Sequence, residues 1–187
     1  MLRLILASSS ARRAELLRAA DITFEIVPAE IDERPLAGET PAAHVERLAR
    51  EKVGAVAPQH PRAEILAADT TVVIDGLMLG KPADDTEARA MLTRLSGRTH
   101  EVLTGVALIR DGHLVSAVDT TSVRFVPMSD ADIDWYVASG EPRGKAGAYG
   151  IQGLASRFVD RIEGSYSNVV GLPMALVWRL LRSELRA

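Results

Sequence analysis

The chain has 187 residues, of which 47% are hydrophobic and 25% are charged, so it is long enough to bury a core of its own. Its formal net charge of −3 argues against a protein that coats nucleic acid non-specifically, and the lack of cysteine excludes disulfides, thiolate metal sites and cysteine nucleophiles. The histidines show no metal-ligand spacing, no run reaches the length of a membrane helix, and the apolar start is too short for a signal peptide. We therefore expect a single domain over residues 1–187 in the cytoplasm, with no nucleic-acid or membrane partner.

The first segment combines a strand, a small polar turn and a helix. Leu2–Ala7 is an apolar run that predicts a buried strand, and a helix pattern begins at Ala11, which one of the intervening serines is suited to cap. Such a turn, here with Ser8, points free backbone N–H groups at an anion. Arg12 and Arg13 lie in the first helical turn, where cations oppose the helix dipole. A bound phosphate would explain both arginines, and a solvated arginine pair is the alternative.

An acidic loop follows the short strand predicted at Phe24–Val27. It contains Glu30, Asp32 and Glu33, and such a loop is most often simply solvated. Its carboxylates are also the hard oxygen ligands that Mg²⁺ prefers, so Glu33 or Asp32 is a candidate metal ligand.

The pair Thr40 and Pro41 predicts the start of a helix that runs to about Ala57. Lys52 falls inside the apolar stripe of this helix. A lysine in that position either extends its amine to solvent or reaches an anion, and the sequence leaves both open.

The segment Ile65–Ile74 reads as a strand that is buried on both faces, with Asp69 in its middle. A carboxylate there is costly unless a cation, a metal or several donors meet it, so Asp69 is either part of a site or a structural carboxylate. An Asp75-Gly76 hairpin follows, and Lys81 emerges just beyond it. This order predicts a cation near Asp69.

The second half continues the mixed pattern. Asp84 opens a helix, and His100–Ile109 and His113–Val126 form a hairpin through Asp111-Gly112. A further helix begins after Ser129. Long antiparallel strands between helices indicate an α/β fold with a mixed sheet rather than an all-parallel one.

The stretch Gly140–Gly153 is the least regular, and it carries Lys145, Tyr149 and Gln152 among its glycines. Glycine lets a backbone approach a ligand closely, although a flexible connector is the alternative. A strand at Phe158–Ile162, a polar loop from 164 to 168 and a helix opened by Pro173 complete the chain.

Candidate anion ligands thus lie on several separate segments: Ser8, Arg12, Arg13, Lys52, Lys81 and Lys145. Asp69, with Glu33 or Asp32, could serve as a metal ligand or base, while Thr70, Tyr149 and Gln152 could read a ring. No hydrolase triad order and no zinc-protease motif is present. These residues favour a Mg²⁺-dependent enzyme that acts on a polyphosphate.

The chain resembles the Maf (septum formation) family of nucleoside triphosphate pyrophosphatases. The motifs that carry the resemblance are Ser8–Arg13, Ala67–Thr70, Gly80–Pro82, Ser96–His100, Lys145–Gly153 and Gly164–Pro173. The resemblance implies an elongated mixed sheet flanked by helices, with two lobes and a central cleft, as in the inosine triphosphatases. It also implies hydrolysis between the α- and β-phosphates, and Ala146–Gly153 is similar to the branch that acts on dTTP and UTP.

The resemblance carries roles onto matching positions. Asp69 would be the base that activates water, with Glu33 and Lys52 beside it, and a divalent cation (Mg²⁺ or Mn²⁺) would be held by Glu33 and Asp69. Phosphate contacts would come from Ser8 and Lys81, and base selection from Arg12, Thr70 and Gln152. Whether Asp69 acts as base or as metal ligand is left open by the sequence.

The chain departs from the family pattern at two positions, where Ala11 replaces a proline and Gly144 replaces an aspartate. The second change removes an expected partner of Lys145. By resemblance we also expect a homodimer and a house-cleaning role in the nucleotide pool. The alternative function is a nucleotide-binding regulator of cell division that acts through a protein partner.

Overall fold

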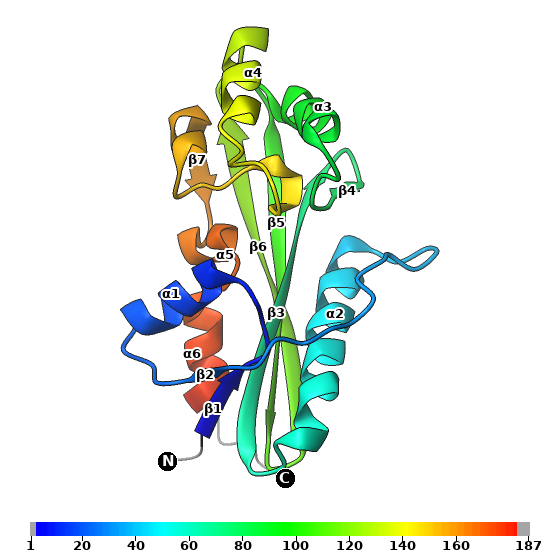
Figure 1. Ribbon diagram of the computed structural model, residues 1–187, viewed down its shortest axis with the longest axis vertical. Coiled ribbons are helices and arrows are strands. Elements are labelled where there is room, and N and C mark those ends of the chain that lie inside the picture. Colours follow the sequence, from blue (N-terminus) through cyan, green and yellow to red (C-terminus); the bar gives the residue numbers. More distant parts are fainter. Residues whose placement is uncertain (1–2, 183–187) are drawn as a thin grey trace. The chain divides into compact units, whose positions relative to one another are not determined.

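A computed structural model describes residues 3–182; the part of the first predicted strand that falls on Leu2 lies outside them. The helices are α1 (Ala11–Ala19), α2 (Pro41–Val56), α3 (Asp85–Leu95), α4 (Asp130–Ala138), α5 (Tyr166–Val170) and α6 (Met174–Arg182). The strands are β1 (Arg3–Leu6), β2 (Glu25–Ile26), β3 (Ala63–Ile74), β4 (Leu77–Leu79), β5 (Thr99–Arg110), β6 (His113–Phe125) and β7 (Val159–Glu163). Short 3₁₀ helices are η1 (Ala57–Gln59), η2 (Ala146–Ala148) and η3 (Leu154–Phe158). Figure 1 shows these elements along the chain.

All seven strands belong to one sheet with the order β2-β1-β3-β5-β6-β7, and β4 pairs with β3 beside this path. The β2-β1 and β1-β3 pairs are parallel, whereas β3-β4 and β6-β7 are antiparallel. The α/β fold with a mixed sheet, predicted from the long strands and hairpin signals, is therefore confirmed.

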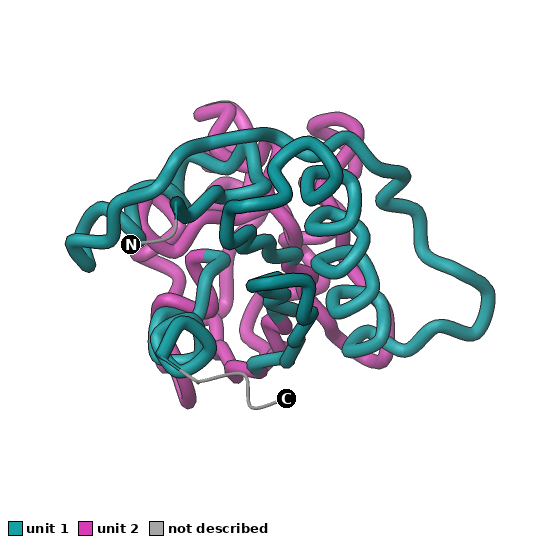
Figure 2. The backbone as a smooth tube through the Cα atoms, turned by 90° about the horizontal axis from the view of Figure 1, so that it is seen from below, with its two compact units in different colours: residues 1–69, 104–119, 171–187 teal, residues 70–103, 120–170 magenta. Residues whose placement is uncertain are grey.

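The described chain divides into two compact units, each made of separate stretches (Figure 2). The first unit is drawn from Met1–Asp69, Thr104–Asp119 and Gly171–Ala187, and the second from Thr70–Leu103 and Thr120–Val170. The division falls inside β3, β5 and β6, so each of these strands contributes residues to both units.

The core of the first unit has a helix layer on each face of its strands. Successive strand side chains point to opposite faces, so neighbouring residues of β1 and β3 enter different layers. The layer with α1 and α6 contains Leu4, Leu6, Ala14, Leu17, Leu66, Ala68, Val106, Leu108, Leu172, Leu176 and Val177. The layer with α2 contains Ile5, Ala7, Ala49, Val53, Val56, Ile65, Ala67 and Ala107. The helices α1 and α2 therefore cover opposite faces of this unit's strands.

Helix α2 approaches the sheet at a glycine. A Cβ atom on Gly105 in β5 would lie 2.3 Å from the carbonyl oxygen of Val45, a backbone atom of the helix. Only a residue without a side chain allows this approach. Gly105 therefore fixes the depth at which α2 lies on the first unit's strands.

The second unit is built around buried aromatic rings. His100 and Phe125 pack edge to face with their ring centroids 4.9 Å apart, and Phe125 packs in the same manner on Tyr149 at 4.8 Å. Tyr136 of α4 contacts Phe158 of η3 with centroids 5.8 Å apart. The glycine-rich segment that contains Tyr149 is thereby packed into this unit rather than acting as a free connector.

The local signals for turns and caps are largely confirmed. Asp75 and Asp111, each followed by glycine, have positive φ angles, as type I′ hairpin turns require. The Thr40 side chain accepts a hydrogen bond from the backbone N–H of Ala43, and Ser129 forms a reciprocal capping box.

The expected polar loop from 164 to 168 was wrong, whereas the serine cap of α1 and the last strand were confirmed except in detail. Ser10 occupies the N-cap of α1 but its side chain makes no cap hydrogen bond, and the Ser8 hydroxyl accepts one from the N–H of Ser10 instead. The predicted polar loop from 164 to 168 contains most of helix α5. Phe158 ends η3 instead of starting the last strand, which begins at Val159.

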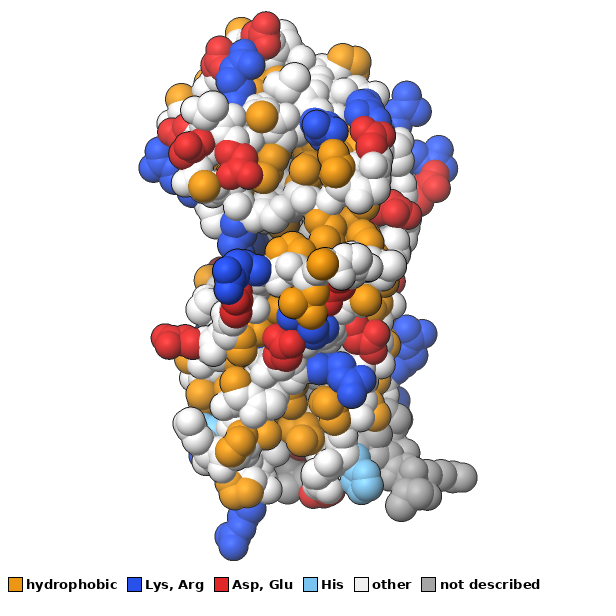
Figure 3. All heavy atoms as spheres, turned by 90° about the vertical axis from the view of Figure 1, so that its right-hand side faces the viewer, with side chains coloured by type: hydrophobic (Ala, Val, Ile, Leu, Met, Phe, Trp, Pro, Cys, Tyr) orange, Lys and Arg blue, Asp and Glu red, His pale blue; other side chains and the backbone are white. Residues whose placement is uncertain are grey.

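No helix within residues 3–182 is long and apolar enough to cross a membrane. On the face drawn in Figure 3, acidic and basic side chains are intermixed over the surface. This mixture agrees with the small formal net charge of −3.

Candidate functional site

The first unit brings the ends of three parallel strands to one edge. β2, β1 and β3 all run in the same direction, so the segments that follow their carboxyl ends meet there. Ser8 follows β1, the acidic loop with Glu33 follows β2, and Asp69 lies in β3 beyond its pairing with β1. From β1 the chain passes through α1 to β2 on one side of β1, and it then passes through α2 to β3 on the other side. This reversal of direction makes the edge a topological switch point. Ligands commonly bind at such points in α/β sheets.

Lys52 of α2 joins the two candidate carboxylates. Its Nζ donates to Oδ1 of Asp69 at 2.6 Å and lies 2.7 Å from Oε1 of Glu33. Lys52 and Asp69 are buried, whereas the side chain of Glu33 is 40% exposed. The alternatives for Lys52 are thus resolved, since its amine reaches anions inside the protein.

The strand period explains why Asp69 meets Lys52. Asp69 alternates with Ile65 and Ala67, both of which pack in the layer formed by α2. Lys52 lies next to Val53 in the buried stripe of that helix. A buried ion pair of this kind is costly to break, because removing one partner leaves the other charge uncompensated.

A second set of contacts comes from the start of α1. Arg13 donates from Nη1 to the Ser8 hydroxyl at 3.2 Å and from Nε to the carbonyl oxygen of Gly171 at 2.8 Å. Burial lowers the pKa of the Arg13 guanidinium below its usual value, and the positive charge of Arg12 lowers this pKa further. The negative charges of Asp69 and Glu33 raise it. These influences place Arg13 in the electrostatic field of both carboxylates.

We call the residues Ser8, Arg13, Glu33, Lys52 and Asp69 the carboxylate–lysine cluster. The cluster has two cations, Arg13 and Lys52, and two carboxylates. The neighbouring Arg12 adds a third cation, which leaves one surplus positive charge. A surplus cation beside a switch point suits an anionic ligand such as a phosphate.

The cluster also contains the oxygen donors proposed for a metal. Within residues 3–182 no group of three or more histidine, aspartate or glutamate side chains is placed to hold a metal ion. Glu33 and Asp69 provide two carboxylates that meet at one amine. This number fits Mg²⁺ or Mn²⁺, which commonly take one or two carboxylates and complete their shell with phosphate oxygens and water.

The remaining predicted residues lie in the second unit. The backbone N–H of Gly147 donates to the carbonyl oxygen of Gly80 at 3.1 Å, which places the glycine-rich loop next to the segment that carries Lys81. Lys145 donates from Nζ to the backbone carbonyl of Glu141, so it has a partner that does not depend on a side chain at position 144. Gln152 is exposed within the same loop.

Glu141 is a structural residue of this loop that the sequence did not reveal. Its carboxylate accepts hydrogen bonds from the Tyr136 hydroxyl at 2.9 Å and from the backbone N–H of Leu154 at 2.8 Å. A Cβ atom on Gly153 would lie 2.3 Å from an oxygen of this carboxylate. The glycine spacing of the loop was the available signal, because glycine is needed where a side chain passes close to the backbone.

Thr70 lies in β3 directly after Asp69 and is partly buried. The structure therefore gathers Ser8, Arg13, Glu33, Lys52 and Asp69 in the first unit. It places Thr70, Lys81, Lys145 and Gln152 in the second. The roles of these residues in binding or catalysis remain predictions.

Comparison with known proteins identifies relatives over nearly the entire chain. The family model described as "Maf-like protein" matches residues 3–184. A dTTP/UTP pyrophosphatase of Symbiobacterium thermophilum is 55% identical over 174 residues, which cover 93% of this chain and 90% of that protein. The protein of the same name from Myxococcus xanthus is 55% identical over 178 residues, covering 95% and 90%.

A solved structure is similar in fold. The HAM1 protein from Coxiella burnetii superposes with a TM-score of 0.53 at 19% sequence identity, covering 98% of this chain and 100% of that one. At this level of identity the similarity concerns the fold alone.

Proposed function

Because the chain belongs to the Maf family, we propose that it hydrolyses nucleoside triphosphates to the monophosphate and pyrophosphate, with dTTP and UTP preferred. Relatives named dTTP/UTP pyrophosphatase share about half of its residues over most of both chains. The observation that carries the proposal is the buried ion pair of Lys52 and Asp69 at the switch point of the sheet. A carboxylate beside anionic phosphates opposes their binding, whereas a hydrolase can use it as a base.

In the proposed reaction, Asp69 acts on the attacking water. Lys52 donates a hydrogen bond to Oδ1 of Asp69 at 2.6 Å. The other carboxylate oxygen, Oδ2, takes a proton from the water while the oxygen of that water bonds to the α-phosphorus. The bond between that phosphorus and the oxygen bridging to the β-phosphate breaks, and pyrophosphate leaves with the bonding electrons. Fixing the carboxylate before substrate binds reduces the entropy that the reaction must lose.

Cationic residues of this chain bind the phosphates in our proposal. Arg13 and Arg12 at the start of α1, together with the Ser8 hydroxyl, would neutralise and orient phosphate oxygens. Lys81 and Lys145 would contribute further positive charge to the triphosphate.

Mg²⁺ or Mn²⁺ would be held by Glu33 and Asp69 when it is bound. The ion would supply charge neutralisation on the phosphates, and the two carboxylates are the hard oxygen donors that such ions prefer. Asp69 as base and Asp69 as metal ligand remain two forms of this proposal.

Gln152 is the proposed reader of the base. Its amide offers one donor and one acceptor, which match the N3–H and the neighbouring carbonyl oxygen of a uracil or thymine edge. The residue is exposed in a loop that Glu141 and the ring of Tyr149 hold in place. Operation as a cytoplasmic homodimer stays a prediction.

The test is pyrophosphate release from dTTP, UTP, CTP, 5-methyl-UTP, 7-methyl-GTP and ITP, with Mg²⁺ or Mn²⁺ and with chelator. We expect metal-dependent release led by dTTP and UTP. Asp69→Asn should abolish most of it, on the order of 10³-fold or more if the proton acceptor is lost. Asp111→Asn is the matched control, because Asp111 is an exposed turn residue whose positive φ asparagine also tolerates.

Each outcome is informative. Release led by 7-methyl-GTP or ITP would retain the enzyme and reject the role of Gln152 in base choice. A rate for Asp69→Asn within a few-fold of the parent would refute the catalytic role of Asp69. No release from any nucleotide would favour the nucleotide-binding regulator.

A further inference from the structure

We propose that Arg47 is a positioning residue for the reaction, because it fixes the loop that presents Glu33 to Lys52. The inference rests on the proposed function and adds a residue to it. Every contact in the argument lies inside the first unit.

The loop between β2 and α2 contains no helix or strand that could hold it. After the N–H of Val27 donates to the carbonyl oxygen of Leu6 at 3.1 Å, no regular element follows until Pro41. A loop of this length has many accessible conformations unless side chains hold it. Glu33 lies in its middle, so the course of its backbone depends on contacts made elsewhere in the loop.

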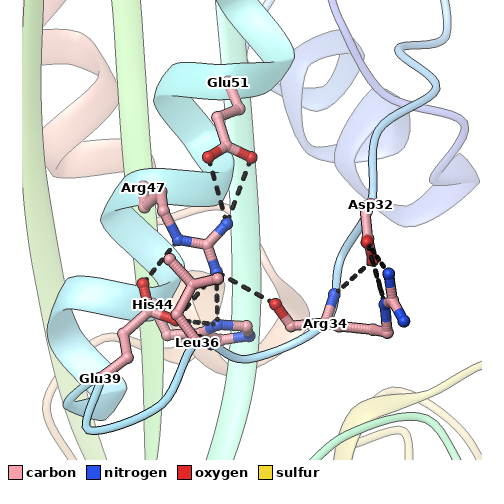
Figure 4. Close-up of polar contacts among 7 residues, drawn as sticks. All are labelled: Asp32, Arg34, Leu36, Glu39, His44, Arg47 and Glu51. Atoms are coloured by element: carbon pink, nitrogen blue, oxygen red, sulfur yellow. Dashed lines mark hydrogen bonds and ion pairs between the residues drawn. The ribbon is translucent and has the colours of Figure 1, made fainter.

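Arg47, on the second turn of α2, supplies such contacts at two points (Figure 4). Its Nη2 donates to the backbone carbonyl of Arg34, the residue after Glu33, at 3.2 Å. Its Nε and Nη2 also donate to the two carboxylate oxygens of Glu39, at 2.6 Å and 2.8 Å. A bidentate guanidinium–carboxylate pair has a defined geometry, which the ammonium of a lysine would not impose.

Glu39 closes the end of the loop around this guanidinium. Its Oε2 accepts a hydrogen bond from the backbone N–H of Leu36 at 3.1 Å and lies 3.0 Å from Nδ1 of His44 (Figure 4). Only 7% of the Glu39 side chain is exposed. The hydrogen bonds from Arg47, above all, lower the pKa of Glu39 to about 2, so the carboxylate stays charged at neutral pH.

The neighbouring pair of Asp32 and Arg34 differs from this arrangement. Their side chains are 59% and 87% exposed, and both belong to the loop itself, so their contacts at 2.9 Å cannot attach the loop to a helix. Exposed pairs contribute little in general. This pair therefore does not attach the loop to α2, whereas the contacts of Arg47 with the Arg34 carbonyl and with the Glu39 carboxylate do.

The same helix carries Lys52, which lies 2.7 Å from the Glu33 carboxylate. Helix α2 thus contacts the loop at the carbonyl of Arg34 and the carboxylate of Glu39 through Arg47, and at the side chain of Glu33 through Lys52. With the backbone fixed by Arg47, the Glu33 carboxylate has few positions other than beside Lys52 and Asp69. Without it, Glu33 would spend much of its time away from the cluster.

The experiment compares Arg47→Gln with Glu51→Gln, alone and combined with Glu33→Gln. Glu51 is the matched control, because it accepts from Arg47 at 3.2 Å on the outer, 43% exposed side and does not contact the loop. We expect Arg47→Gln to lower kcat by roughly 10- to 100-fold, the size expected when a catalytic group is misplaced, and Glu51→Gln to change it less than about threefold.

The combination separates positioning from general destabilisation. If Arg47 acts through Glu33, Arg47→Gln should cause no further loss in the Glu33→Gln background. Losses that multiply in the double variant, or an Arg47→Gln rate within threefold of Glu51→Gln, would overturn the inference.

A second measurement does not need turnover. Amide hydrogen exchange of peptides covering residues 28–40 should be faster in Arg47→Gln than in the parent and unchanged in Glu51→Gln. Unchanged exchange in Arg47→Gln would refute the inference even for an active enzyme. Absence of turnover in the parent would refute the proposed function, whereas the exchange result would still decide whether Arg47 fixes the loop.

Discussion

The buried histidine of the second unit makes the stability of the protein depend on pH between about 6.5 and 4. His100 is 2% exposed, and its Nε2 is hydrogen-bonded to the Tyr149 hydroxyl at 2.9 Å. Within residues 3–182, its Nδ1 has no hydrogen-bond partner. Burial lowers the pKa of His100 from 6.5 to about 4, because the ring would lose its hydration as a cation. The histidine is therefore neutral in the folded protein at pH 5.

The direction and size of the effect follow from the two pKa values. Between pH 6.5 and 4 the unfolded chain binds a proton on this histidine and the folded protein does not, so the free energy of unfolding falls as the pH falls. Each pH unit is worth at most about 1.36 kcal/mol. From pH 8 to pH 4.5, about two units below the unfolded pKa, His100 alone should remove about 2.5 kcal/mol of stability.

Urea unfolding at several pH values between 8 and 4.5 measures this loss. The variant His100→Gln should be less stable than the parent at pH 8, but its stability should fall by about 2.5 kcal/mol less over the range. His113→Gln is the matched control, because it makes the same substitution at a histidine that is exposed on β6. Parallel curves for His100→Gln and the parent would refute the argument that His100 is buried in its neutral form.

Two predictions concern glycines at close approaches. Gly105→Ala places a methyl group 2.3 Å from the carbonyl oxygen of Val45, so α2 must shift, and thermal unfolding should show a loss of about 3 kcal/mol; a loss below 1 kcal/mol would contradict the packing described. Gly147 and Gly144 both have positive φ, so alanine should cost about 1 kcal/mol of strain at either position. Only at Gly147 would it meet Val72, at 2.7 Å, so urea unfolding should show Gly147→Ala less stable than Gly144→Ala by a further 1–3 kcal/mol. Equal losses would exclude that contact.

Signals that act over a few residues predicted much of the fold. The Asp-Gly pairs at 75–76 and 111–112 predicted both hairpins, and Thr40-Pro41 predicted the start of α2, because turn and cap geometry depend on neighbouring residues. The order β2-β1-β3 could not be read in this way, since parallel pairing joins distant segments whose apolar patterns look alike. Helix α5 was missed because Tyr166–Val170 is too short to show a helical period.

The candidate site was only partly predictable for the same reason. A lysine in an apolar stripe marked Lys52 as unusual, but the residue pattern alone did not identify its partners. The family resemblance placed Glu33 and Asp69 beside it, and the structure shows both contacts. Arg47 and Glu39 carry no such signal, because charged residues at the edge of a helix or in a loop are usually solvated. Their importance arises from burial of the Glu39 carboxylate, which is a property of the folded loop.

The division of the chain into interleaved stretches has a consequence for its synthesis. Leu172, Leu176 and Val177, close to the end of the described chain, belong to the same core as Leu4 and Leu6 near its beginning. During translation the first unit therefore lacks part of its hydrophobic core until α6 has left the ribosome. The second unit, drawn from residues 70–103 and 120–170, has all of its stretches available earlier. We expect the unit that carries the carboxylate–lysine cluster to be the later of the two to fold on the ribosome, although β1 and α1 of that unit are made before any part of the other.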